Sequence, residues 1–412
     1  MKTSQTHYTS FISFLLFAIT ALLLFTVGFV LVISMLFVYL NEGGIDAQST
    51  IYTATMFFMG LLLGVVSVVS LLRFLNKPAA DAMVSTSFQG WKIAAGVFGA
   101  GLALLIGHLV WDNSSINWLV LPLLTIPAVT LPIWTITGLG ARNLSLGSRW
   151  RMWSALGISL TATPFVLFML EIMIVVLIFI FIIVYVALNP DMAAEFERFS
   201  TQFAYLDMQS EEALRQIVPY LMKPVVIIPV VVFIAMIIPL IEELLKPLAV
   251  WLLAGKLDSE AQGFAFGALC GAGFALWETF NVSGQMNEWG ILLFTRVGTG
   301  LLHITTSALM GGAIYLAVRE RRYMRLLGTY LLAVLLHGLW NLAAITTSFS
   351  AVAITYTQLD GYEPIQWASG IGLIVLAIGL FILLVVSNRK LQKAMLISAS
   401  EDTPEAQGNP NI

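Results

Sequence analysis

Charged residues are scarce in this sequence: only 10% of its 412 residues are Asp, Glu, Lys or Arg, against roughly 25% in soluble domains. Cysteine is almost absent as well. Cys270 is the single one, which excludes an intramolecular disulfide framework and a multi-cysteine metal site. A basic excess is also lacking, because the net charge is −3, and this argues against a nucleic-acid partner. Hydrophobic residues make up 59% of the chain, which indicates a polytopic membrane protein embedded in a lipid bilayer.

The hydrophobic residues fall into ten segments of about 20 residues or more, each long enough to cross a bilayer as a helix. The first, 11–40, is too long for the core of a cleavable signal, so we expect it to be a retained span. The predicted fold is an all-α, polytopic transmembrane helical bundle of ten spans. The other nine segments are 51–75, 92–111, 118–138, 155–188, 224–254, 262–282, 289–318, 326–347 and 367–386.

The basic residues test this segmentation, because Lys and Arg concentrate in cytoplasmic loops. Most of the 20 basic residues fall in alternate loops, and the loops between carry acidic residues instead. This alternation predicts that both termini are cytoplasmic. The exceptions are Arg198, Arg215, Lys223 and Arg296.

The long connection at 189–222 differs in composition from the spans around it. Phe196, Phe199 and Phe203 follow helical spacing there, and Ser210 is a suitable N-cap for a second helix. We expect two amphipathic helices on the outer membrane surface, with a lid that gates substrate as the alternative. The predicted domains are a five-span N-terminal region (1–188), this extracytoplasmic loop (189–222), a four-helix core (223–347), a loop with the last span (348–397) and a disordered cytoplasmic tail (398–412).

Three ionisable residues lie inside the sixth span: Glu242, Glu243 and Lys246. A charge at the centre of a transmembrane helix costs about 2.5–3.5 kcal/mol, so such residues normally face a protein interior. At about 100° per residue, all three lie within one wedge of the helix. They therefore form a single polar face.

The seventh span carries small residues at four-residue spacing, Gly263, Gly267 and Gly271, which lets another helix approach closely. Glu278 lies about 20° from this ridge, because it follows Gly271 by seven residues. Its carboxylate should therefore point into a helix interface and not into lipid.

Two of the four histidines lie in the next two spans of this core. His303 shares a face with Arg296, and His337 stands one turn before Asn341. Counting about 1.5 Å of rise per residue places both histidines near the bilayer midplane. Acids, a lysine and histidines on four successive spans favour a functional site over isolated helix contacts.

The ordered pattern of these residues resembles the PrsW family of intramembrane proteases, distant relatives of the type II CAAX prenyl endopeptidases. The resemblance covers about residues 224–347, and Thr279 departs from it, because many relatives have Asn directly after the glutamate. The motifs are Glu242-Glu243-x-x-Lys246, Gly273-Phe274-Ala275-x-x-Glu278, His303, and His337-x-x-Trp340-Asn341.

This resemblance implies an intramembrane endopeptidase that hydrolyses peptide bonds of membrane-anchored proteins. In the member for which the family is named, the substrate is an anti-sigma factor, whose cleavage releases a sigma factor. A single-pass regulator of this kind is thus the implied partner, and the cell membrane of a prokaryote the implied location.

The residue types allow peptide hydrolysis by an activated water. A buried carboxylate suits the general base, which we assign to Glu242 or Glu243, with Lys246 tuning or pairing with the other. His337 and Asn341 would stabilise the oxyanion. The remaining two candidate catalytic residues, Glu278 and His303, would complete the water or metal site.

A zinc ion is one option for this site, because His303, His337 and Glu278 form an adequate ligand set. The resemblance leaves the metal open, since related enzymes can be glutamate-dependent without one, and the sequence lacks a His-Glu-x-x-His pattern. Two other functions also stay open: an ion- or proton-coupled transporter, and a non-catalytic membrane scaffold or sensor.

Overall fold

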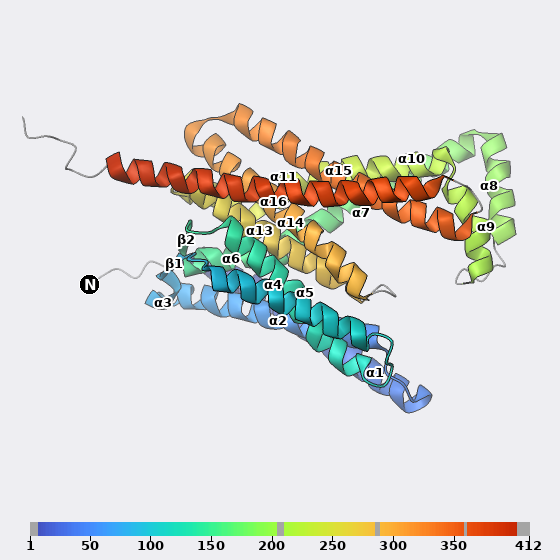
Figure 1. Cartoon of the computed structure of the whole chain (residues 1–412), viewed down its shortest axis with the longest axis horizontal. Helices are drawn as coiled ribbons and strands as arrows, with labels where there is room; N and C mark the ends of the chain where they lie inside the picture. The colour runs from blue at the N-terminus through green and yellow to red at the C-terminus, as the bar shows by residue number, and fades with distance from the viewer. Residues whose placement is uncertain (1–6, 204–209, 285–288, 358–360, 402–412) are drawn as a thin grey trace, which may run out of the picture. The chain divides into compact units, whose positions relative to one another are not determined.

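The computed structural model describes residues 7–203, 210–284, 289–357 and 361–401, and nearly all of them are helical (Figure 1). Ten helices within these ranges are long and apolar enough to cross a membrane, which confirms the predicted ten-span, all-α bundle. The predicted tail falls mostly at 402–412, outside the described residues. The chain divides into two compact units, Met1–Pro164, Glu243–Ala333 and Gly379–Ile412 in unit 1, and Phe165–Glu242 and Val334–Ile378 in unit 2.

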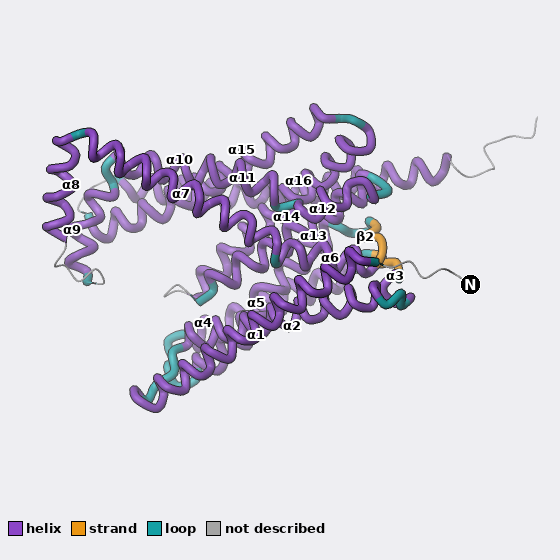
Figure 2. The backbone as a smooth tube through the Cα atoms, turned by 180° about the vertical axis from the view of Figure 1, so that it is seen from behind, coloured by secondary structure: helices purple, strands orange, loops and turns teal. Residues whose placement is uncertain are grey.

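Unit 1 begins with four spans. α1 packs along α2 (Figure 2). In this contact Gly28 lies against the ring of Phe57. β1 and β2 pair as a short antiparallel ribbon. The elements of this region are α1 (Tyr8–Glu42), α2 (Ala47–Phe74), α3 (Pro78–Asp81), β1 (Met83–Ser85), α4 (Gly90–Val110), α5 (Asn117–Gly140), β2 (Ser145–Ser148) and α6 (Arg149–Leu160).

The most enclosed helices of unit 1 are α13 (Glu260–Val282) and α14 (Trp289–Glu320), which lie side by side (Figure 1). In each, 83% of the most hydrophobic 18-residue window is buried, against 44% or less in the other spans. Most residues in these two windows therefore face protein instead of lipid. α12 (Leu248–Leu253) and the short 3₁₀ helix η2 (Ala254–Lys256) precede them.

Small residues bring α13 and α14 into backbone contact, as their spacing predicts. A Cβ at Gly263 would lie 2.5 Å from the carbonyl oxygen of Gly311, and one at Gly267 would lie 2.1 Å from that of Ser307. At Gly271 it would lie 2.2 Å from the carbonyl oxygen of His303. Only glycine can occupy these three positions at this separation.

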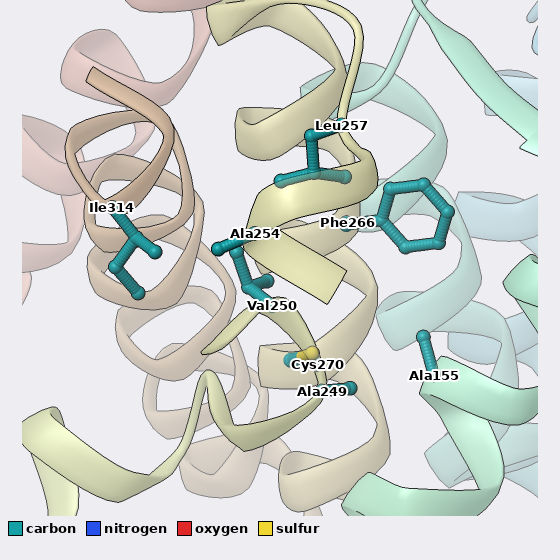
Figure 3. Packing of buried hydrophobic residues seen from close by; sticks show 8 residues of the cluster. All are labelled: Ala155, Ala249, Val250, Ala254, Leu257, Phe266, Cys270 and Ile314. Carbon is teal, nitrogen blue, oxygen red and sulfur yellow. The ribbon is translucent and has the colours of Figure 1, made fainter. Parts of the chain in front are cut away.

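A compact apolar cluster supports α13 from the side that faces α6 and α12 (Figure 3). It includes Cys270, the only cysteine, which is fully buried. This cluster packs part of unit 1 together without polar groups. Its members are Ala155, Ala249, Val250, Ala254, Leu257, Phe266, Cys270 and Ile314.

Unit 2 contains the two helices expected at 189–222. They are α8 (Pro190–Phe203) and α9 (Glu211–Leu221), and the Ser210 hydroxyl accepts the N–H of Ala213, as an N-cap should. Their place on the membrane surface stays a prediction. The other elements are α7 (Ala162–Leu188), nearly all of it in this unit, α10 (Pro224–Val232) and the π-helical turn η1 (Phe233–Ile237).

Besides α7, three helices contribute residues to both units: α11 (Ile238–Leu245), α15 (Tyr323–Tyr356) and α16 (Tyr362–Glu401). In α11 the boundary falls between Glu242 and Glu243. These consecutive acids therefore belong to different units, and their surroundings are described separately below.

Candidate active site in the membrane spans

Lys246 is the centre of the polar network in unit 1. Its ammonium group donates to Glu243 Oε1 at 2.8 Å and lies 2.8 Å from His303 Nδ1. Glu243 reaches it because the two residues stand three apart, on one face of the sixth span. Both side chains are 0% exposed, so the pair is removed from water and each charge depends on the other.

His303 links this pair to a second acid. Its Nε2 lies 2.6 Å from Glu278 Oε2, and the same oxygen lies 2.7 Å from the Arg296 guanidinium. A neutral imidazole satisfies both neighbours if Nε2–H donates to the carboxylate and Nδ1 accepts from Lys246, so we assign that tautomer. The described network then alternates in charge from Arg296 to Glu278, through neutral His303, to Lys246 and Glu243.

Phe274 supports the two nitrogen groups of this network. Its ring centroid lies 5.0 Å from Lys246 Nζ, within cation–π range, and 5.1 Å from the His303 ring in a perpendicular arrangement. The sequence pattern contains Phe274 but assigns it no role. It provides an apolar wall against which a buried ammonium can still be stabilised.

In unit 2, α15 presents a polar face to the sixth span. His337 Nε2 lies 3.8 Å from Glu242 Oε2, and the side chains are 4% and 12% exposed. One turn later, Asn341 Nδ2 donates to the carbonyl of Ile234 at 2.9 Å. The spacing of His337 and Asn341 thus places both on the side of α15 that contacts the sixth span.

Each predicted site residue therefore has a polar neighbour inside its own unit. Two residues join the set that sequence reasoning did not include, Arg296 and Phe274. Arg296 had a signal, since it is a basic residue that breaks the alternation of loop charges and shares a face with His303. The residues of unit 1 are Glu243, Lys246, Glu278 and His303, and those of unit 2 are Glu242, His337 and Asn341.

The donor distances test whether these residues suit zinc. Two atoms bound to one tetrahedral zinc at about 2.0–2.2 Å lie roughly 3.3 Å apart. Glu278 and His303, at 2.6 Å, are closer than that and form a direct hydrogen bond. Glu242 and His337, at 3.8 Å, come near the spacing of two ligands. Glu242 and His337 of unit 2 therefore fit two ligands of a zinc site. Glu278 and His303 are hydrogen-bonded to each other at a distance too short for two ligands of one zinc ion.

Acids, imidazoles and a buried lysine inside membrane spans are typical of functional sites. The model of the PrsW family intramembrane metalloproteases matches residues 165–384, a little more than half of the chain, and the chain belongs to that family. The match is wider than the region of the sequence motifs, since it begins in α7 and ends in α16. No curated protein and no solved structure matches the chain.

The chain is accordingly an intramembrane peptidase and an integral, multi-pass membrane protein. This activity decides between the functions left open by the sequence, because it accounts for the polar spans without a transporter or a scaffold. Its substrates are membrane proteins, and it meets them in the bilayer.

Proposed function

We propose that the chain cuts membrane-anchored, single-pass regulatory proteins of the anti-sigma type in a prokaryotic cell membrane, with Glu242 as the general base. The observation that carries the choice of base is the different surroundings of the two acids. Glu243 is fully buried and bonded to the Lys246 ammonium, which holds it as a structural anion. Glu242 is 12% exposed and lies 3.8 Å from the imidazole of His337, a neighbour with which it can exchange a proton during the reaction.

In the proposed reaction, Glu242 takes a proton from a water molecule as the water oxygen bonds to the scissile carbonyl carbon. His337 donates a hydrogen bond to the oxygen on which negative charge develops. The C–N bond then breaks, and Glu242 returns the proton to the leaving amine. The sequence also gives Asn341 a part in the oxyanion site; its hydrogen bond to Ile234 supports a different role, argued in the next subsection.

The residues of unit 1 hold the sixth span in place for this chemistry. Lys246 anchors Glu243, the residue next to the proposed base, and Glu278 fixes the tautomer of His303. We propose these three, with His303, as positioning and tuning groups.

The family description supports a metal, and we propose zinc as the ion. Glu242 and His337 would hold it. When bound, zinc would supply Lewis-acid polarisation of the carbonyl. In that case Glu242 is a ligand as well as a proton acceptor, and the metal content of the purified protein decides between the two versions.

The test of the proposed function is a comparison of membrane-protein termini in cells that express the wild type or Glu242→Gln. New ends within or beside single-pass segments should appear with the wild type and disappear with the variant. A Glu363→Gln variant, altered at the start of α16, is the matched control and should keep the new ends. Identical termini in the presence of wild type and Glu242→Gln would refute Glu242 as the base.

A further inference from the structure

Pro239 interrupts the backbone hydrogen bonds of the sixth span just before the two acids. In a regular α-helix, the N–H of residue 239 would donate a hydrogen bond to the carbonyl of Ala235, and in a π-helix it would donate to the carbonyl of Ile234. Proline has no N–H. The Ile238 N–H does not donate to the Ile234 carbonyl either, because it donates to the carbonyl of Phe233, five residues back, in the π-helical turn η1. The Ile234 carbonyl therefore receives no hydrogen bond from residue 238 or 239, and the Ala235 carbonyl receives none from residue 239.

Both of these carbonyls face α15 within unit 2. Asn341 Nδ2 donates to the Ile234 oxygen at 2.9 Å. A Cβ at Gly338 would lie 2.4 Å from the Ala235 oxygen, so that carbonyl points at the bare Cα of the glycine. The same face of α15 carries His337, which lies opposite Glu242. One helix face thus meets the two carbonyls to which residue 239 donates no hydrogen bond, and it also meets the proposed base.

The π-helical turn decides where Glu242 points. A π turn accommodates one more residue than an α turn, and one residue is about 100° of helical rotation. Glu242 follows Pro239 by three residues. Relaxation of η1 to α geometry would therefore turn the carboxylate by about that angle, away from His337. A backbone carbonyl left without a donor in a bilayer costs several kcal/mol, which favours such a rearrangement unless another group bonds it.

We propose that Asn341 is a positioning residue: its amide bonds the Ile234 carbonyl left without a donor by Pro239, and thereby holds η1 so that Glu242 stays opposite His337. The inference rests on the proposed function of Glu242. It differs from the oxyanion role in one consequence. If Asn341 acts through the backbone, an N–H introduced at position 239 can replace its hydrogen bond to Ile234. If Asn341 instead donates to the oxyanion, no substitution at position 239 can replace that lost donor.

The experiment is a suppressor test with Asn341→Ala, the double variant Asn341→Ala/Pro239→Ala, and a control double variant Asn341→Ala/Pro229→Ala. Pro229 also lies inside the sixth span, but in α10, before the π turn. Purified proteins are reconstituted in liposomes with a library of tagged single-pass segments, and initial cleavage rates are measured. We expect Asn341→Ala to lower the rate at least tenfold, since about 1 Å of misplacement can cost about 100-fold. The Pro239→Ala double variant should return to within about threefold of wild type, and the Pro229→Ala double variant should not.

A second readout does not depend on cleavage. The double variant Glu242→Cys/His337→Cys is made in a Cys270→Ser background, which removes the only native thiol, and its two thiols are joined by a short crosslinker. Asn341→Ala should reduce the crosslinked fraction several-fold, and adding Pro239→Ala should restore it. Unchanged crosslinking in Asn341→Ala, or equal rescue by both proline variants, would overturn the proposal. If wild type cleaves nothing while crosslinking behaves as expected, the proposed function fails and the positioning role stands.

Discussion

Replacing Lys246 with methionine should cost the protein a large part of its stability. Methionine keeps most of the side-chain volume of lysine but removes the ammonium, and it leaves Glu243 as a buried carboxylate. Both side chains are 0% exposed and their charged atoms lie 2.8 Å apart. Removal of one partner from such a pair costs about 3–5 kcal/mol, because the remaining charge stays out of water.

The double variant Lys246→Met/Glu243→Gln tests the physical origin of that loss. It removes the buried charge together with its partner, so it should recover most of the free energy of unfolding and come within about 1–2 kcal/mol of wild type. The exposed pair of Arg322 and Glu320, 3.0 Å apart with side chains 59% and 38% exposed, is the control. Arg322→Gln should change stability by less than about 1 kcal/mol.

The assay is reversible unfolding of the purified protein by SDS in mixed micelles, followed by tryptophan fluorescence. Wild type, the two single variants at Lys246 and Glu243, the double variant and the control complete a double-mutant cycle. Additive single effects, or a Lys246→Met loss as small as that of the exposed control, would refute the reasoning, because they would mean that water reaches the pair.

Three other changes follow from the same structure. Arg296→Gln should lower cleavage more than Arg296→Lys does, since lysine keeps a positive charge beside Glu278; equal losses in initial rate would contradict this. Gly267→Ala should destabilise by about 1–3 kcal/mol in the same SDS assay, because its Cβ would meet a backbone carbonyl of α14. Gly379→Ala, with no atom within 4 Å of its Cβ, should stay within about 0.5 kcal/mol. Elemental analysis should find zinc in wild type and lose it in a His337→Ala variant; equal zinc in both would exclude this ligand.

The sequence alone predicts the number of spans and the direction of Glu278. Hydropathy suffices for the first, because the bilayer demands about 20 apolar residues per helix. Helical geometry suffices for the second, because the glycine ridge marks the side of α13 that a neighbour must cover.

The different surroundings of the two acids could not be predicted in this way. Glu242 and Glu243 are both within one turn of Lys246, and helical spacing favours neither strongly. The distinction arises from tertiary contacts: His303 and Phe274 come from other helices and hold the ammonium on the side of Glu243. The π turn is likewise a tertiary result, although Pro239 marks where regular bonding must fail.

The backbone contact of α13 with α14 also limits how these helices can move. The three glycines of α13 repeat every four residues, about 6 Å along the axis, and each meets a carbonyl of α14. Longitudinal sliding would drive the next residue of α13, which has a side chain, into a carbonyl before a new fit was reached. A slip of one turn, about 5.4 Å, would also separate Glu278 from His303, now 2.6 Å apart. The backbone contacts therefore oppose sliding of the two helices and keep the side chains of the ionic network in register.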